Sequence, residues 1–72
     1  MISYEPLWET MRQQQITTYT LITKYGIPSS TVYSLKHNKN ITMHTLERLC
    51  SILNCSAERI VTFKNGDGAE IE

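Results

Sequence analysis

The sequence feature that most constrains the fold is a tight corner near the middle of the chain, within the stretch TYTLITKYGIPSSTVYSLKH at residues 18–37. Two short bursts of apolar residues lie on either side of a Tyr25-Gly26-Ile27 corner. Because glycine has no Cβ, Gly26 can adopt the positive φ that a sharp bend between two helices requires. Two short helices joined by such a bend form a helix-turn-helix, and we expect that motif here.

The other apolar residues also recur at helical spacing in short pieces, so the predicted fold class is all-α. Thr17 and Thr42 are good N-caps, whereas Gly26 and Asn54 suit the left-handed residue that ends a helix. The prediction is five short helices: residues 5–14, residues 18–25, a third from Pro28 or Ser29 to the polar run 37–40, a fourth between Thr42 and Asn54, and residues 57–62.

Apolar positions on these helices define one predicted core. Its members are Leu7, Trp8, Met11, Leu21, Ile22, Ile27, Val32, Leu35, Leu46, Leu49, Cys50, Leu53 and Ile60. We expect residues 1–64 to form a single domain, because a chain of 72 residues is too short for two. Residues 65–72 are polar and terminal, and we expect a flexible tail there, although the NGDG segment also fits the turn of a small hairpin.

The formal net charge is zero, but the charges are unevenly distributed. No acidic residue occurs between residues 10 and 46, whereas Arg12, Lys24, Lys36 and Lys39 all fall in that window. Such a segment can present a basic face to phosphate groups even on a neutral chain. The alternative is a solvated surface that lacks acids by chance, because so few cations are involved.

Several classes of protein are disfavoured by the sequence. No apolar run is as long as a membrane span, and the start MISYEPLWET has neither the basic region nor the apolar core of a signal peptide. We therefore expect a cytoplasmic protein with no membrane association. Cys50 and Cys55 lie near the end of one predicted helix, and reduced, structural thiols are favoured over a disulfide between them.

An enzyme or a metal site would need reactive side chains that share a site. The candidates are His37, His44, Cys50 and Cys55, and none of their spacings matches C-x-x-C or H-x-x-x-H. His44 and Cys50 fall on nearly opposite faces of one predicted helix. We therefore expect no enzymatic activity, no metal, no cofactor and no small-molecule ligand.

The second helix of the helix-turn-helix has an outward face that needs another explanation. Val32 and Leu35 are three residues apart and are expected to point inward. The outward face then consists of Ser29, Ser30, Tyr33, Ser34 and His37. In DNA-binding versions of the motif this helix enters the major groove. A serine hydroxyl both donates and accepts hydrogen bonds, so it can contact base edges with weak discrimination.

The segments LITKYGIPSSTVYSLKHN and TMHTLERLCSILNCSAERIV resemble the phage-repressor and Cro type of helix-turn-helix domain, the XRE family with a lambda-repressor-like fold. ISYEPLWETM also resembles the first helix of small stand-alone members. The resemblance runs from about Tyr4 to Phe63. The sequence departs from the family pattern at Ile22, where alanine is usual, at Pro28 before the recognition helix, and at the serines that stand where glutamines often lead it.

The resemblance implies which side chains contact DNA. The base-facing positions are Ser29, Ser30, Tyr33, Ser34 and, one turn further on, His37. The phosphate-facing positions are Thr17, Thr18, Tyr19, Lys36, Lys39 and Asn40, because helix N-termini and cations attract phosphate. Two alternatives stay open: Ser29 or Ser30 can cap the recognition helix instead, and Tyr33 can pack on the surface of the domain.

The resemblance also implies a transcriptional regulator, in our interpretation a repressor, that binds a near-palindromic operator in double-stranded DNA as a homodimer. Ile52, Val61 and Phe63 are the candidates for the dimer surface, because they add apolar surface beyond the core. Alternatively, Phe63 folds back onto the core. The competing interpretation is a protein-interaction module of the same fold, such as an antitoxin or anti-repressor, which has no need of an acid-free segment.

Overall fold

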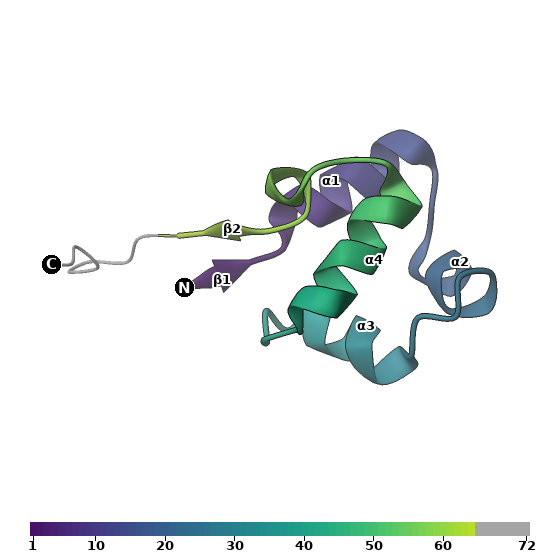
Figure 1. Ribbon diagram of the computed structural model, residues 1–72, viewed down its shortest axis with the longest axis horizontal. Coiled ribbons are helices and arrows are strands. Elements are labelled where there is room, and N and C mark those ends of the chain that lie inside the picture. The colour runs from purple at the N-terminus through teal and green to yellow at the C-terminus, as the bar shows by residue number, and fades with distance from the viewer. Residues whose placement is uncertain (65–72) are drawn as a thin grey trace, which may run out of the picture.

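The computed structural model describes residues 1–64, which form four α-helices, a 3₁₀ turn and a two-stranded antiparallel sheet (Figure 1). In chain order the elements are β1 (Ile2–Ser3), α1 (Glu5–Gln14), α2 (Thr18–Thr23), α3 (Ser29–Lys36), α4 (Met43–Leu53), η1 (Ala57–Arg59) and β2 (Thr62–Phe63). The all-α class with a helix-turn-helix is confirmed, with a small sheet in addition. The expected flexible tail, residues 65–72, and its alternative hairpin lie outside the described residues.

Local capping chemistry fixes where the helices begin and end. The Thr17 hydroxyl accepts a hydrogen bond of 3.1 Å from the backbone N–H of Thr20 and so caps α2. Thr42 caps α4 in the same way, through the N–H of Thr45 at 3.1 Å. At its other end, α4 terminates at Asn54, whose φ of 53° is left-handed. Residue type alone predicts all three of these signals.

Helix α2 is shorter than predicted, because it ends at Thr23 rather than at residue 25. The chain leaves the helix early because the N–H of Ile27 donates to the carbonyl of Leu21 at 3.0 Å. That bond draws Ile27 back under α2, where its side chain is 1% exposed. Residues 24–26, between the end of α2 and Ile27, therefore belong to the corner.

The predicted fifth helix over residues 57–62 is only partly formed. Only Ala57–Arg59 form a 3₁₀ turn, and the chain then extends into β2. Strand β2 pairs with β1, with Ile2 opposite Phe63 and Ser3 opposite Thr62. The N–H of Lys64 also donates to the carbonyl of Met1 at 2.7 Å. Pairing with the first residues of the chain satisfies the backbone groups that a helix would have satisfied locally.

The core lies between α1, α3, α4 and the corner, and ten apolar side chains in it are buried. They are Tyr4, Leu7, Met11, Leu21, Ile27, Val32, Leu35, Leu49, Leu53 and Ile60. Three further predicted core residues, Trp8, Leu46 and Cys50, are half-buried against it. The prediction for Ile22 is wrong, because its side chain is 36% exposed. A six-residue helix buries one narrow face, and Leu21 occupies it.

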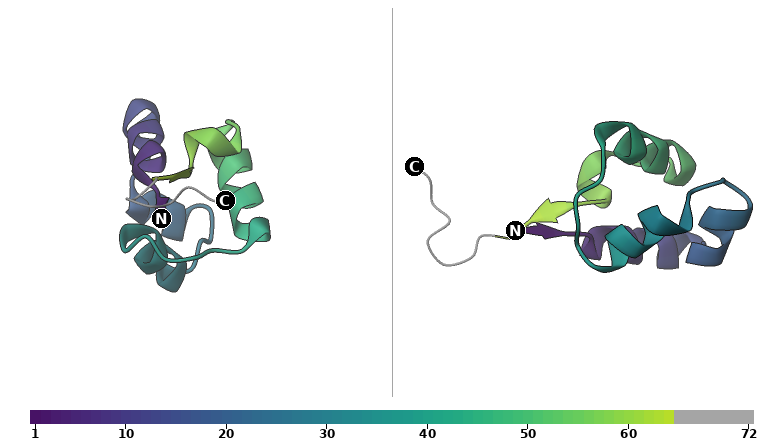
Figure 2. Two further views of the ribbon diagram at one scale, coloured as in Figure 1. Left: turned by 90° about the vertical axis from the view of Figure 1, so that its left-hand side faces the viewer. Right: turned by 90° about the horizontal axis from the view of Figure 1, so that it is seen from below.

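The two strands lie at one end of the molecule and α2 lies at the other, with α3 between them. Figure 1 shows the strands at the left, α3 at the bottom centre and α2 at the right. In Figure 2 the strands project from one end of the helical body. None of the helices within residues 1–64 combines the length and apolarity that crossing a bilayer would require.

The two cysteines lie together at the end of α4. The N–H of Cys55 donates to the carbonyl of Cys50 at 3.0 Å, as expected where a helix ends in a left-handed residue. Both thiols are free and half-buried. Burial raises the pKa of the Cys55 thiol, the neighbouring Cys50 raises it further, and Arg59 lowers it. The protonated, neutral form of Cys55 therefore suits its position.

Candidate nucleic-acid interface

The corner of the helix-turn-helix is built around a left-handed glycine, as predicted. Gly26 has a φ of 71°, and a Cβ added there would meet no atom within 4 Å. The requirement for glycine is therefore conformational rather than steric. The corner is also tied to α4, because Arg48 Nη2 donates to the backbone carbonyl of Tyr25 at 2.6 Å. The sequence analysis did not identify Arg48, since nothing in the local pattern links α4 to a carbonyl so far away in the chain.

One face of helix α3 is buried in the domain, and the opposite face is exposed to solvent. Val32 and Leu35 are 5% and 0% exposed, so they fix the rotation of the helix about its axis. The side chains predicted to face bases do not lie on this buried face. Ser29, Ser30, Tyr33 and His37 are exposed, and Ser34 is half-buried. The N-cap position is Pro28, and no side chain caps the helix. Neither Ser29 nor Ser30 therefore has the capping role considered as an alternative.

Two rings on the outer face of α3 pack against each other. The ring centroids of Tyr33 and His37 are 4.2 Å apart, with a tilt of 37° between the ring planes. Tyr33 is still 56% exposed. It therefore packs on its helical neighbour rather than on the body of the domain. The contact restricts both side chains and leaves their outer edges accessible.

The predicted phosphate contacts fall into two separate groups. Thr17, Thr18 and Tyr19 lie at the start of α2, where Tyr19 is 73% exposed and Thr18 is half-buried. The Thr17 hydroxyl already accepts the capping hydrogen bond. An anion at this end of α2 would therefore be bound by the exposed helix terminus rather than by that hydroxyl. The second group, Lys36, Lys39 and Asn40, is exposed and lies at the end of α3 and in the loop that follows.

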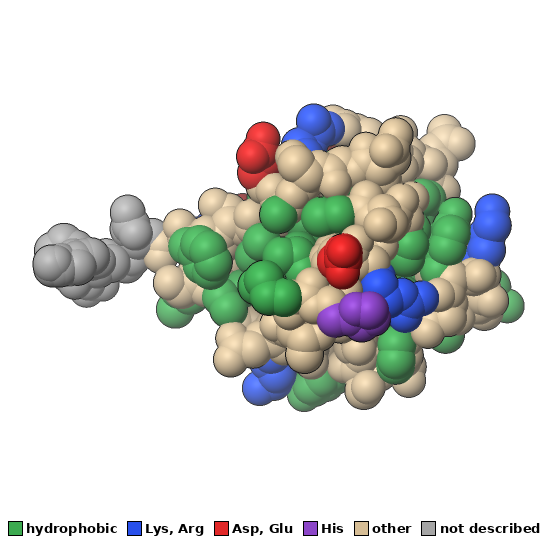
Figure 3. Space-filling model, in the orientation of Figure 1, with side chains coloured by type: hydrophobic (Ala, Val, Ile, Leu, Met, Phe, Trp, Pro, Cys, Tyr) green, Lys and Arg blue, Asp and Glu red, His purple; other side chains and the backbone are tan. Residues whose placement is uncertain are grey.

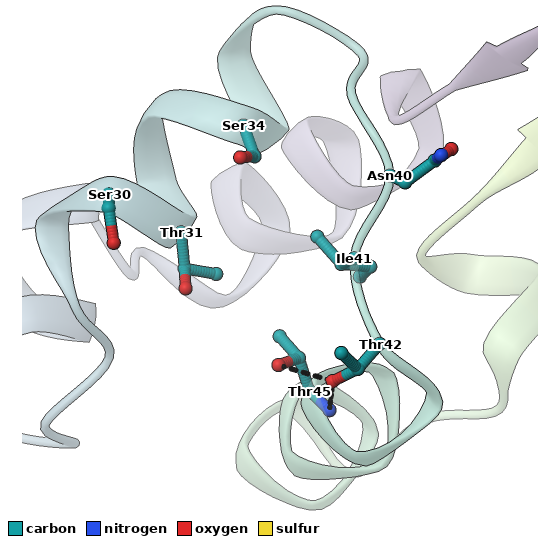
Figure 4. A pocket seen from close by; sticks show the side chains of 7 residues that line it. All are labelled: Ser30, Thr31, Ser34, Asn40, Ile41, Thr42 and Thr45. Atoms are coloured by element: carbon teal, nitrogen blue, oxygen red, sulfur yellow. Dashed lines mark hydrogen bonds between the residues drawn. The ribbon is translucent and has the colours of Figure 1, made fainter.

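A shallow pocket lined by hydroxyl groups separates α3 from the start of α4 (Figure 4). Its volume is ≈ 220 Å³, and its lining residues are Ser30, Thr31, Ser34, Asn40, Ile41, Thr42 and Thr45. Figure 4 shows Ser30, Ser34 and Thr31 facing Thr42 and Thr45 across it, with the amide of Asn40 turned away. The Thr42 and Thr45 hydroxyls are 3.0 Å apart and hydrogen-bonded.

Sequence reasoning missed Thr31, Thr42 and Thr45 as part of this face. Thr42 is the predicted helix cap, and the same residue also lines the pocket. The available signal was the spacing of Thr42 and Thr45, which places two hydroxyls on the first turn of α4. Each hydroxyl can donate and accept, so the pocket suits a polar group that presents both functions.

The lysines near α3 form no ion pair with an acidic residue of the described part of the chain. Within residues 1–64, ion pairs join Glu9 to Arg12 and Glu5 to Lys64, and His44 Nδ1 lies 4.0 Å from a carboxylate oxygen of Glu47. None of these pairs involves Lys24, Lys36 or Lys39, whereas the fourth cation of the acid-free window, Arg12, is paired. Lysines next to α3 without an acidic partner in this part of the chain leave a local positive potential.

No three His, Cys, Asp or Glu side chains of residues 1–64 gather into a group that could hold a metal ion. His37, one of the four residues considered for metal or thiol chemistry, instead contacts Tyr33. His44 lies 4.0 Å from a carboxylate oxygen of Glu47 on the exposed first turn of α4.

Two of the three candidate dimer residues lie at an apolar groove formed chiefly by the two strands, the start of α4 and η1. Val61 is half-buried and Phe63 is 70% exposed, so Phe63 does not fold back onto the core. The groove has a volume of ≈ 240 Å³ and is lined by Ile2, Tyr4, Ile41, Met43, Leu46, Ala57, Val61 and Phe63. Figure 3 shows apolar side chains gathered on this face. Ile52 is half-buried and is not among the lining residues.

Comparison with known proteins agrees with this geometry. The chain matches the family model of the Cro/C1-type HTH DNA-binding domain over residues 6–65. It is also similar to the crystal structure of the transcriptional regulator VanUg, Form II, with a TM-score of 0.79 and 28% sequence identity, over 85% of this chain and 81% of that one. None of the curated proteins compared with the chain matches it. The chain therefore belongs to the family of Cro/C1-type helix-turn-helix DNA-binding domains.

Proposed function

We propose that the protein is a sequence-specific transcriptional regulator that inserts α3 into the major groove of double-stranded DNA. The observation that carries this proposal is the orientation of α3. Its buried seam of Val32 and Leu35 leaves an outer face of hydroxyls and a ring pair, beside lysines that form no ion pair within residues 1–64. The similar protein VanUg is a transcriptional regulator, which supports the same assignment.

Each part of this surface has a distinct role in the proposal. Ser30, Ser34 and Tyr33 contact base edges, since hydroxyl groups can donate to and accept from them. Lys36 and Lys39 contact phosphate, which supplies affinity without sequence information. The exposed N-terminus of α2 at Thr17 approaches the backbone on the other side of the helix-turn-helix.

We further propose that the protein binds its operator as a homodimer through the apolar groove. The groove has a shape that suits a second copy of itself. Phe63 and Met43 are 70% and 76% exposed and project beside a hollow of ≈ 240 Å³. In a two-fold interface the same patch meets itself, so the protruding side chains of each copy can enter the hollow of the other.

Charges beside the groove are also compatible with self-association. Lys64 follows Phe63 in the chain, and its Nζ lies 3.0 Å from Glu5 Oε2. Because the Glu5 carboxylate has a cationic partner in Lys64, its charge is balanced when two copies approach through the groove. In this proposal Ile52 has no role at the interface, since it lies outside the groove.

In this proposal, the protein represses transcription by occupying its operator. A dimer that covers two half-sites of a promoter blocks polymerase by position. Two recognition helices related by a two-fold axis require a near-palindromic site, with half-sites about 10 base pairs apart.

Selection of duplexes from a random library by the purified protein tests the DNA-binding proposal. We expect an enriched motif with two-fold symmetry and the half-site spacing given above. Failure to enrich any motif at low salt would contradict the proposal and favour the competing function, a protein-interaction module. The groove is the feature that would serve such a module.

Sedimentation at micromolar concentration tests the dimer separately. The wild-type protein and a Tyr19→Ser control are expected to sediment as dimers, whereas Phe63→Ser is expected to sediment as a monomer. Tyr19 is a matched control because it is an equally exposed aromatic residue outside the groove, at 73% against 70%. A strictly monomeric wild type, with and without DNA, would disprove the dimer.

A further inference from the structure

We propose that Tyr4 is a positioning residue for DNA binding, which holds the loop after α3 so that Lys39 can reach a phosphate group. The inference rests on the proposed DNA-binding function. It assigns a role to a residue that lies outside the helix-turn-helix, in the short connection between β1 and α1.

Tyr4 makes two hydrogen bonds to the loop. Its hydroxyl donates to the backbone carbonyl of Lys39 at 2.6 Å, and its backbone N–H donates to Asn38 Oδ1 at 3.2 Å. The Tyr4 side chain is itself 1% exposed, so the anchor is fixed in the core. Two adjacent loop residues are thereby tied to a point 34 and 35 residues away in the chain.

The loop has a defined conformation at the place where Tyr4 binds it. Asn38 follows the C-cap of α3 and has a φ of 55°, and the N–H of Lys39 donates to the carbonyl of Ser34 at 2.8 Å. These bonds fix the loop relative to its own helix. The bonds from Tyr4 fix it relative to the body of the domain, which α3 alone cannot do.

A loop that is already ordered before DNA binds favours binding. The long, exposed Lys39 side chain remains mobile, but its backbone does not have to be ordered when DNA binds, which reduces the entropic cost. Burial also raises the pKa of the Tyr4 hydroxyl, so the group stays protonated and able to donate.

The test compares Tyr4→Phe with wild type by fluorescence-anisotropy titration, using the duplex enriched from the random library and a scrambled duplex. Phenylalanine keeps the buried ring and removes only the donor. We expect both duplexes to bind about two- to tenfold more weakly, the value of one lost hydrogen bond, with the ratio of their affinities unchanged. Thr10→Val is the matched control, because Thr10 is also buried and its hydroxyl donates to a backbone carbonyl, that of Arg59 at 2.9 Å, outside α3 and its loop. This variant should bind like wild type.

A double-mutant cycle separates positioning from a general loss of structure. If Tyr4 acts through Lys39, then adding Tyr4→Phe to Lys39→Ala should weaken binding by less than about twofold. A general structural defect would weaken Lys39→Ala as much as it weakens wild type, and that result would overturn the inference.

Should Tyr4→Phe fail to fold, Asn38→Gly decides the question. Glycine accepts the positive φ at this position and removes the Oδ1 acceptor, so the same uniform loss of affinity is expected. Wild-type affinity in a folded Tyr4→Phe or Asn38→Gly protein would disprove the positioning role. If wild type itself binds no DNA, the proposed function fails instead.

Discussion

Arg48 and Tyr25 are joined by a hydrogen bond of 2.6 Å from the guanidinium Nη2 of Arg48 to the backbone carbonyl of Tyr25. The bond connects the middle of α4 to the corner between α2 and α3. The carbonyl lies just before Gly26, where the chain has left α2 and cannot bond to its own helix. Helix α4 therefore supports the corner that sets the angle of the recognition helix.

Removal of this bond is expected to destabilise the fold. Arg48→Met keeps an apolar stem and deletes the donor, so we expect a loss of about 1–3 kcal/mol in the free energy of unfolding, measured by urea denaturation. Arg59→Met is the control, because the Arg59 guanidinium bonds to the exposed side chain of Gln13 at 3.3 Å, and its loss should be under about 0.5 kcal/mol. Equal losses for both variants would show that the Tyr25 contact has no special role.

The packing of α4 can be tested at its most buried position. Leu49 is 0% exposed, and Leu49→Ala should cost about 2–5 kcal/mol because it leaves a cavity in the core. Ile22→Ala should cost under about 1 kcal/mol, since Ile22 is 36% exposed. The two losses can be compared by thermal or urea unfolding. A loss below about 1 kcal/mol for Leu49→Ala would contradict the placement of α4.

Alkaline pH is expected to destabilise the protein. The pKa values of the Tyr4 hydroxyl and the Cys55 thiol are both raised in the folded state, chiefly by burial. Unfolded cysteine and tyrosine lose their protons near about pH 8.5 and about pH 10, so the unfolded state binds fewer protons than the folded state above those values. Their contribution to stability is therefore complete at neutral pH and is lost as the pH rises.

Urea midpoints measured from neutral pH to about pH 10.5 check this prediction. The wild-type midpoint should fall at the alkaline end, and the double variant Tyr4→Phe/Cys55→Ala should show a smaller fall. The double variant removes both groups and leaves every other titratable group in place. An identical fall in both proteins would show that other groups cause it.

The parts of the fold that were predictable from sequence depend on neighbouring residues. Thr17 and Thr42 cap helices by bonding three residues ahead, Gly26 turns the corner through its positive φ, and Asn54 ends α4 in the same left-handed conformation. The outward face of α3 was predictable for the same reason, because the spacing of inward residues fixes it. Caps, left-handed residues and helix faces depend on residues within about one helical turn of each other. Residue type and spacing are therefore sufficient to locate them.

The missed features all depend on partners far away in the chain. Ile60 and Val61 fit a helix that continues from residue 57, but Thr62 and Phe63 pair with the strand at Ile2 and Ser3 instead. Tyr4 was not assigned to the core, because its burial depends on the loop that contains Lys39. The hydroxyl pocket likewise combines α3 with α4. In each case tertiary contacts override or supplement the local signal.

The central claim, that α3 contacts bases while Lys39 contacts phosphate, is tested most directly by anisotropy titrations of Ser30→Ala, Ser34→Ala and Lys39→Ala. Each variant is titrated with operator and scrambled DNA at several salt concentrations. Lys39→Ala should weaken both sequences alike and lower the log–log salt slope by about 0.9 per subunit, because fewer counterions are released.

The serine variants should weaken operator binding alone, by an amount near the low end of about 1–3 kcal/mol, and leave the salt slope unchanged, because a neutral hydroxyl releases no counterion. If instead both serine variants lose operator and scrambled DNA equally, or lose neither, then α3 does not recognise sequence and the account is contradicted.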